Sequence, residues 1–139
     1  IVLSLFICFF FLSCQQNDNA LKQCIKNASK IEVFIYKKSK RGQARVKVFE
    51  SIDRKIMDDF VTFFKPQRTK LFKCGYDGKI VISGFECTLE VEYNLSPDCL
   101  HAIYTIDGET QTQQLTSKGI KFLSSLREKP SRSCKPAAD

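Results

Sequence analysis

Few residues of this chain could pair a nucleophile with a base. His101 is the only histidine, and Cys99 lies two residues before it. Residues two apart on a strand share a face, so Cys99 and His101 could form a Cys–His nucleophile pair or supply two metal ligands, with Cys87 as another possible nucleophile. Zinc needs three or four protein ligands, and the chain has no C-x-x-C or second Cys/His cluster. We therefore expect no metal site and interpret His101 as an ordinary strand residue.

Carboxylates recur at alternate positions of one segment, at Glu86, Glu90 and Glu92. Residues two apart along a strand are about 6.8 Å apart, which matches the carboxylate spacing of inverting glycosidases. Exposed acids that alternate with apolar residues are, however, the usual pattern of a strand with one wet face. The pattern therefore predicts a solvated strand face, and we expect neither enzymatic activity nor a cofactor.

A basic cluster is the strongest binding feature of the chain. Lys37, Lys38, Lys40 and Arg41 precede Gly42 between two apolar segments, which predicts a β-hairpin with a basic tip. Such a tip could contact lipid headgroups, lipopolysaccharide phosphates or an acidic protein surface. Nucleic acid is not expected as a partner, because the cluster lacks interleaved aromatic residues on which bases could stack.

The first twelve residues carry no charge. As a helix they would rise about 18 Å, which is too short to cross a hydrocarbon core of about 30 Å but suits the apolar region of a signal peptide. The following Phe11-Leu12-Ser13-Cys14 resembles the lipobox of bacterial lipoproteins. The resemblance implies removal of residues 1–13, a lipid on Cys14 and anchoring to a membrane of the cell envelope. A plain secreted protein is the alternative.

Removal of such a leader would leave one domain. We expect a tether over 14–19, a single domain over 20–130 and a tail over 131–139. The net charge of +7 is unevenly spread: residues 22–73 hold fifteen Lys/Arg and five Asp/Glu, whereas residues 74–117 hold one Lys and seven acids. A basic and an acidic region together make an oriented field that suits a charged partner.

The cysteines indicate disulfides if the chain is exported. With a lipid on Cys14, five remain, and we expect Cys74 to pair with Cys99, because turns beside both could bring them together. A second expected pair, Cys24 with Cys134, would tie the two ends of the domain, leaving Cys87 as a buried thiol. Without the lipid, six cysteines could form three disulfides.

Hydrophobic periodicity predicts the elements. A short helix is expected over 19–27, a hairpin from strands 31–36 and 44–49, and a helix capped by Ser51 or Asp53 that runs to about Lys65. Strands follow from Phe72 to Ile82, with Phe72, Cys74, Tyr76, Ile80 and Ile82 at positions of one parity, and from Phe85 to Leu95. A turn at Gly84-Phe85 would pair Ile82 with Cys87 and Ile80 with Leu89, with both pairs facing inward.

The remaining elements are a strand over 100–106, an Asp107-Gly108 turn, a polar edge strand over 109–115 and a helix capped by Thr116. The resulting order is α-ββ-α-ββββ-α. It predicts an α+β fold in which helices cover one face of an antiparallel sheet.

In architecture this order resembles the small cystatin-like and inhibitor-type modules. We expect a lipid-anchored, non-catalytic envelope protein that binds another protein, as an inhibitor or immunity protein does. The alternative is a structural or assembly lipoprotein of the outer membrane whose basic hairpin tip binds anionic lipid.

Overall fold

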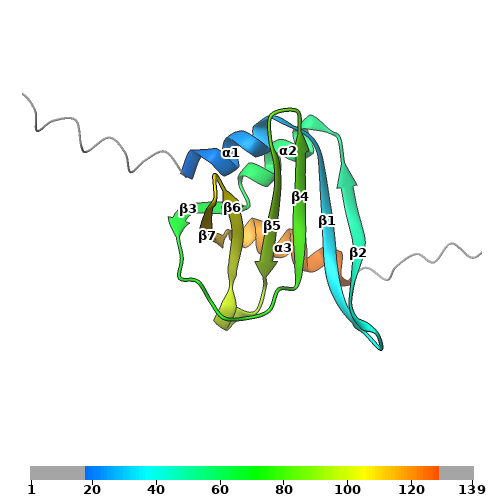
Figure 1. Cartoon of the computed structure of the whole chain (residues 1–139). Helices are drawn as coiled ribbons and strands as arrows, with labels where there is room; N and C mark the ends of the chain where they lie inside the picture. The colour runs from blue at the N-terminus through cyan, green and yellow to red at the C-terminus, as the bar shows by residue number, and fades with distance from the viewer. Residues whose placement is uncertain (1–17, 129–139) are drawn as a thin grey trace, which may run out of the picture.

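The computed structural model describes residues 18–128, which form an α+β fold with a seven-stranded antiparallel sheet and three helices. The segment that resembles a lipobox, up to Cys14, and Cys134 lie outside the described residues. Figure 1 shows the sheet in front and the helices behind it. The strand order is β2-β1-β4-β5-β6-β7-β3.

The elements follow the chain in an order close to the expected one. They are α1 (Asp18–Lys26), β1 (Ala28–Ser39), β2 (Gly42–Ser51), α2 (Arg54–Val61), β3 (Phe64–Arg68), β4 (Gly78–Gly84), β5 (Thr88–Asn94), the 3₁₀ turn η1 (Pro97–Cys99), β6 (His101–Ile106), β7 (Glu109–Leu115) and α3 (Ser117–Glu128).

One face of the sheet supplies most of the core. Alternate residues of β1, β4 and β5 point to the helices and are almost completely buried: Ile31, Val33, Ile35, Ile80, Ile82, Leu89, Val91 and Tyr93. Each helix adds residues to the same cluster, among them Ile25, Phe60 and Leu123. The predicted inward parity of β4 and β5 is therefore confirmed, because a period of two places one set of residues against the helices.

The predicted register of the β4–β5 hairpin was wrong by two residues. Ile82 pairs with Leu89, and Ile80 pairs with Val91, so the connection consists of residues 85–87. Cys87 leaves the strand to bond Cys24 of α1, and the Phe85 side chain is fully exposed. A shift of two residues preserves the inward face, which explains why alternation alone could not detect it.

The first long helix is shorter than predicted. Asp53 caps α2 as expected, accepting hydrogen bonds from the Lys55 and Ile56 amides at 2.8 and 3.5 Å. The helix ends at Val61, and Phe64 enters β3, where it pairs with Leu115 of β7. The predicted edge position of β7 was therefore wrong, because β3 covers its outer side and the edge strand is β3 itself.

The predicted strand before Ile80 also begins later than expected. Phe72, Cys74 and Tyr76 lie in an irregular segment, residues 69–77, and β4 starts at Gly78. Other predicted features are confirmed: Asp107 and Gly108 have φ values of 52° and 78° in the β6–β7 turn, and the Thr116 hydroxyl caps α3 by accepting from the Gly119 amide at 3.2 Å.

Two disulfides join elements that are far apart in sequence. Cys74 pairs with Cys99, as expected, at a Cα–Cα distance of 6.3 Å. Cys24 pairs with Cys87 at 5.6 Å, so the expected Cys24–Cys134 pair and the free thiol at Cys87 were both wrong. The buried face of α1 packs against β4, which brings Cys24 over the β4–β5 connection. Disulfides persist in oxidising compartments, and these two indicate an extracytoplasmic location.

Gly78 allows two chain segments to approach closely at the start of β4. A Cβ atom at this position would lie 2.1 Å from the Phe34 carbonyl oxygen and 2.5 Å from the Tyr93 hydroxyl. We expect Gly78→Ala to lower the free energy of unfolding by about 2 kcal/mol or more, as overpacking does in a tight core. Gly75→Ala is the matched control, since nothing lies within 4 Å of its Cβ position. Urea unfolding of both variants tests this, and equal stability of the two would contradict it.

Removal of either disulfide should destabilise the fold, by about 2–4 kcal/mol. The Cys24–Cys87 bond spans 63 residues and the Cys74–Cys99 bond 25. In the chain-entropy account the longer loop contributes about 0.8 kcal/mol more. Urea unfolding of the two double Cys→Ala variants should show this order. Intact mass with and without reductant checks that both bonds are present in the parent protein.

Candidate functional site

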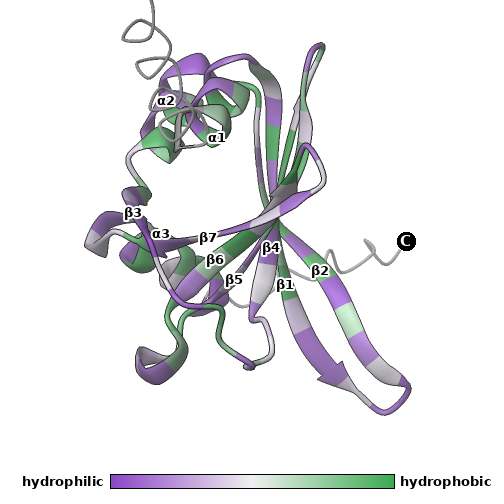
Figure 2. Cartoon of the chain, turned by 60° about the vertical axis from the view of Figure 1, so that its left-hand side comes forward, coloured by the Kyte–Doolittle hydropathy of each residue, from purple (hydrophilic) through white to green (hydrophobic). Residues whose placement is uncertain are grey.

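The β1–β2 hairpin extends beyond the rest of the sheet. The pairing of β1 with β4 reaches Ile35 and Gly78, whereas its pairing with β2 continues to Ser39 and Gly42. We call residues 36–45 the arm. Figures 1 and 2 show the arm projecting from the sheet at the end opposite to α1. β1 starts directly after α1, and a strand from Ala28 to Ser39 is ~36 Å long.

The arm carries five cations and no acidic residue: Lys37, Lys38, Lys40, Arg41 and Arg45. All five side chains are exposed, and within the described part of the chain none of them forms an ion pair. The reversal at the tip is built from the Lys40-Arg41 connection and Gly42, whose φ of 116° favours glycine. The Ser39 hydroxyl accepts a hydrogen bond from the Arg41 amide at 3.2 Å. The structure therefore gathers the predicted basic cluster at one projecting tip and adds Arg45 to it.

Arg45 was not singled out by the sequence pattern, although a signal was present. The alternation of strand 44–49 places Arg45 on the polar face, and the hairpin pairs it with Tyr36. Cross-strand pairing in a two-stranded ribbon brings it beside cations that lie about eight residues earlier.

We call the face of the sheet opposite to the helices the open face (Figure 1). At the base of the arm, Tyr36 links the hairpin to this face. Its hydroxyl donates a hydrogen bond to Glu92 Oε1 at 2.9 Å. Burial, followed by the hydrogen bond to the Glu92 carboxylate, raises the pKa of Tyr36 to about 12. The arm is thus anchored to β5 by a side chain and, by the backbone, to the residue before β4, since the Tyr36 amide donates to the Asp77 carbonyl at 2.8 Å.

The open face has its charges arranged as local pairs. Lys79, whose side chain is 6% exposed, pairs with Glu90, and Glu32 pairs with Lys30 at 3.0 Å and Lys47 at 3.1 Å. The hydrogen bonds from Lys30 and Lys47 lower the pKa of Glu32. The carboxylates of this face are therefore held by neighbouring donors, in contrast to the unpaired cations of the arm.

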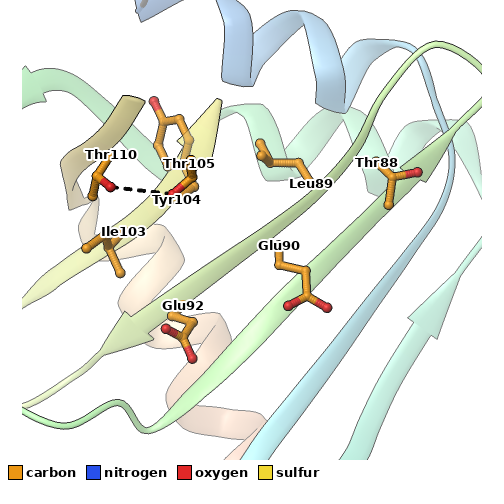
Figure 3. Close-up of a pocket in the computed structure, with 8 residues that line it drawn as sticks. All are labelled: Thr88, Leu89, Glu90, Glu92, Ile103, Tyr104, Thr105 and Thr110. Atoms are coloured by element: carbon orange, nitrogen blue, oxygen red, sulfur yellow. Dashed lines mark hydrogen bonds between the residues drawn. The ribbon is translucent and has the colours of Figure 1, made fainter. Parts of the chain in front are cut away.

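A shallow hollow of about 370 Å³ lies on this face, between β5 and β6. It forms where the register of the two strands stops at Val91 and Tyr104. Figure 3 shows Glu90 and Glu92 beside it, with Thr105 and Thr110 across it on β6 and β7. Glu90 is paired with Lys79 and Glu92 accepts from Tyr36, and Glu86 lies in the connection before β5. The three acids therefore do not form the opposed pair that glycoside hydrolysis requires.

His101 is completely buried at the start of β6. Its Nδ1 lies 2.7 Å from the Cys99 carbonyl oxygen, and the Phe72 and Tyr76 rings pack against it at centroid distances of 5.3 and 5.9 Å. Its Nε2 has no hydrogen-bond partner within the described chain. Cys99 and Cys87 are both in disulfides, so neither thiolate is available for the nucleophile pair considered above.

Among residues 18–128, no group of three or more His, Cys, Asp or Glu side chains is placed to hold a metal ion. Over the same range, none of the helices is both long and apolar enough to cross a membrane. Comparisons with protein-family models, curated proteins and solved structures find no match for this chain. The arm therefore has to be interpreted from its own geometry and charge.

The Tyr36–Glu92 hydrogen bond predicts a specific alkaline titration. Because the folded-state pKa of Tyr36 is raised from 10.0 to about 12, the neutral phenol stabilises the fold below pH 10, and this stability is lost as the pH rises towards 12. Glu92→Gln should lower the pKa of Tyr36 towards 10. Ultraviolet difference titration of the variant against the parent measures it, with Glu86→Gln as control. An unchanged titration would contradict the assigned contact.

Proposed function

We propose that this chain is a non-catalytic binding protein of an extracytoplasmic compartment, which recognises an acidic surface of a partner protein through the arm. The observation that carries the proposal is the set of five exposed cations on a projecting hairpin, none of which forms an ion pair with another described residue. Cations that already have internal partners would have to break those contacts before binding. The arm cations have no ion-pair partner among residues 18–128, so their charge is available to an external acidic group.

The rest of the molecule supports this assignment electrostatically. The arm lies within the segment of residues 22–73, which has a charge of +10, whereas residues 74–117 have a charge of −6 and include Glu90 and Glu92 beside the hollow. A projecting site of one sign orients an approaching partner and raises the association rate, and this effect falls as salt is added. A hairpin held by Tyr36 and by β4 loses little conformational entropy on binding, which favours affinity.

We further propose that Cys14 carries a lipid and anchors the domain to the cell envelope. Only three residues separate Cys14 from Asp18, where α1 begins, so an anchored domain would have its α1 end near the membrane. The arm tip would then point away from that membrane, which favours a protein partner over headgroups of the same bilayer. Such a geometry suits an inhibitor or immunity-like protein that holds a secreted enzyme or toxin.

The arm is tested by charge reversal. Replacing Lys37, Lys38, Lys40 and Arg41 with Glu should abolish retention of a stoichiometric partner from envelope extracts of the source cells. The matched control reverses Lys26, Lys55, Lys70 and Lys73, which are exposed and equal in number, and should retain the partner. Titration calorimetry with the purified partner should then show an affinity that falls steeply with salt for the parent and the control alone.

Three results would contradict the proposal. Retention of the partner by the arm variant would show that the arm cations do not contribute to binding. Turnover of small substrates by the purified domain would make it an enzyme. Arm-dependent binding to phosphatidylglycerol vesicles, with no retained protein, would favour the alternative of a structural or assembly lipoprotein that docks on anionic lipid.

A further inference from the structure

A separate apolar groove lies on the helix side of the molecule, away from the arm. It has a volume of about 430 Å³, within the range of small-molecule sites. Residues of β2, α2 and α3, together with Phe63, line it: Phe49, Ile56, Asp59, Phe60, Phe63, Lys118, Lys121, Phe122 and Ser125.

Four aromatic rings make the apolar part of this groove. Phe122 contacts Phe49, Phe60 and Phe63 at centroid distances of 5.2, 5.4 and 5.1 Å. Phe60 and Phe63 are 1% and 2% exposed and form the floor, whereas Phe49 and Phe122 are only partly buried. Ile56, 39% exposed, adds an apolar edge. A fixed apolar floor with half-open aromatic walls can take up an apolar chain at little cost in reorganisation.

Among the described residues, the charges around the groove form one ion pair and leave Lys121 without one. Asp59 of α2 and Lys118 of α3 bridge the two helices at 2.8 Å and cancel each other. Lys121 lies one helical turn further along α3, is exposed, and forms no ion pair with any described residue. The lining therefore has one Asp and two Lys, a net charge of +1.

We propose that this groove binds a single apolar chain that ends in a carboxylate, as in a fatty acid. The chain lies against Phe60, Phe63 and Phe122, and the carboxylate pairs with Lys121. Lys121, which has no ion pair among the described residues, matches one negative charge, whereas a doubly charged phosphate headgroup would exceed the net charge of +1 on the lining. This site is independent of the arm, so its failure would leave the proposed function untouched.

The test uses laurate as the probe, below its micellar concentration, with dodecanol and dodecylamine as chain-matched controls. Titration calorimetry with the parent protein should show laurate binding more tightly than dodecanol, and dodecylamine binding weakest. Lys121→Gln should reduce the laurate affinity about fivefold, as expected for one exposed ion pair, and leave dodecanol unchanged. Lys55→Gln, on the exposed side of α2, should change neither.

Variants that fill or polarise the groove provide a second, independent test. Ser125→Trp places a large ring over the aromatic floor and should abolish binding of both laurate and dodecanol. Ile56→Asp, at the exposed edge, should weaken both if the tryptophan variant does not fold. No binding of laurate to the parent protein, equal affinity for laurate and dodecanol, or binding that survives both groove variants would overturn the proposal.

Discussion

The length of β1 relative to its neighbours is the constraint on which this structure depends. β1 has twelve residues and hydrogen-bonds to β2 on one side and β4 on the other. Over Ile31 to Ile35 it lies inside the sheet and buries alternate apolar side chains against the helices. Beyond Ile35 it loses β4 and keeps β2 alone. The same strand is therefore core at one end and a projecting arm at the other.

The chemistry of the side chains changes at the same position. Up to Ile35 the pattern is apolar at every second residue, because the strand has a buried face. From Lys37 both faces are wet, and cations replace the apolar residues without cost to the core. Basic side chains on an unprotected ribbon also discourage pairing with other strand edges. The arm thus remains exposed and does not attract other strands, and its charges stay accessible.

Two disulfides and the ion pairs of the open face hold the rest of the domain around β1. Cys24–Cys87 ties α1 to the β4–β5 connection, and Cys74–Cys99 ties the irregular segment 69–77 to η1. That segment covers His101 with Phe72 and Tyr76, so a region without hydrogen-bonded strand structure still has a defined position. On the open face, Glu90 pairs with Lys79, Glu32 pairs with Lys30 and Lys47, and Glu92 accepts from Tyr36, whereas the arm cations form no ion pair with any described residue.

The sequence by itself determined the α+β class, the inward parity of the strands, the Asp107-Gly108 turn, the Thr116 cap and the basic hairpin, and it limited the cap of α2 to Ser51 or Asp53. These depend on periods of two and 3.6 residues and on local hydrogen bonds, which neighbouring residues specify. Only the tertiary structure decided that α2 ends at Val61 so that Phe64 can pair with Leu115, that Cys24 meets Cys87, and that β3 is an edge. Each depends on contacts between segments distant in sequence, and alternation is unchanged by a two-residue slip. The projection of the arm has the same origin, since it depends on where β4 begins.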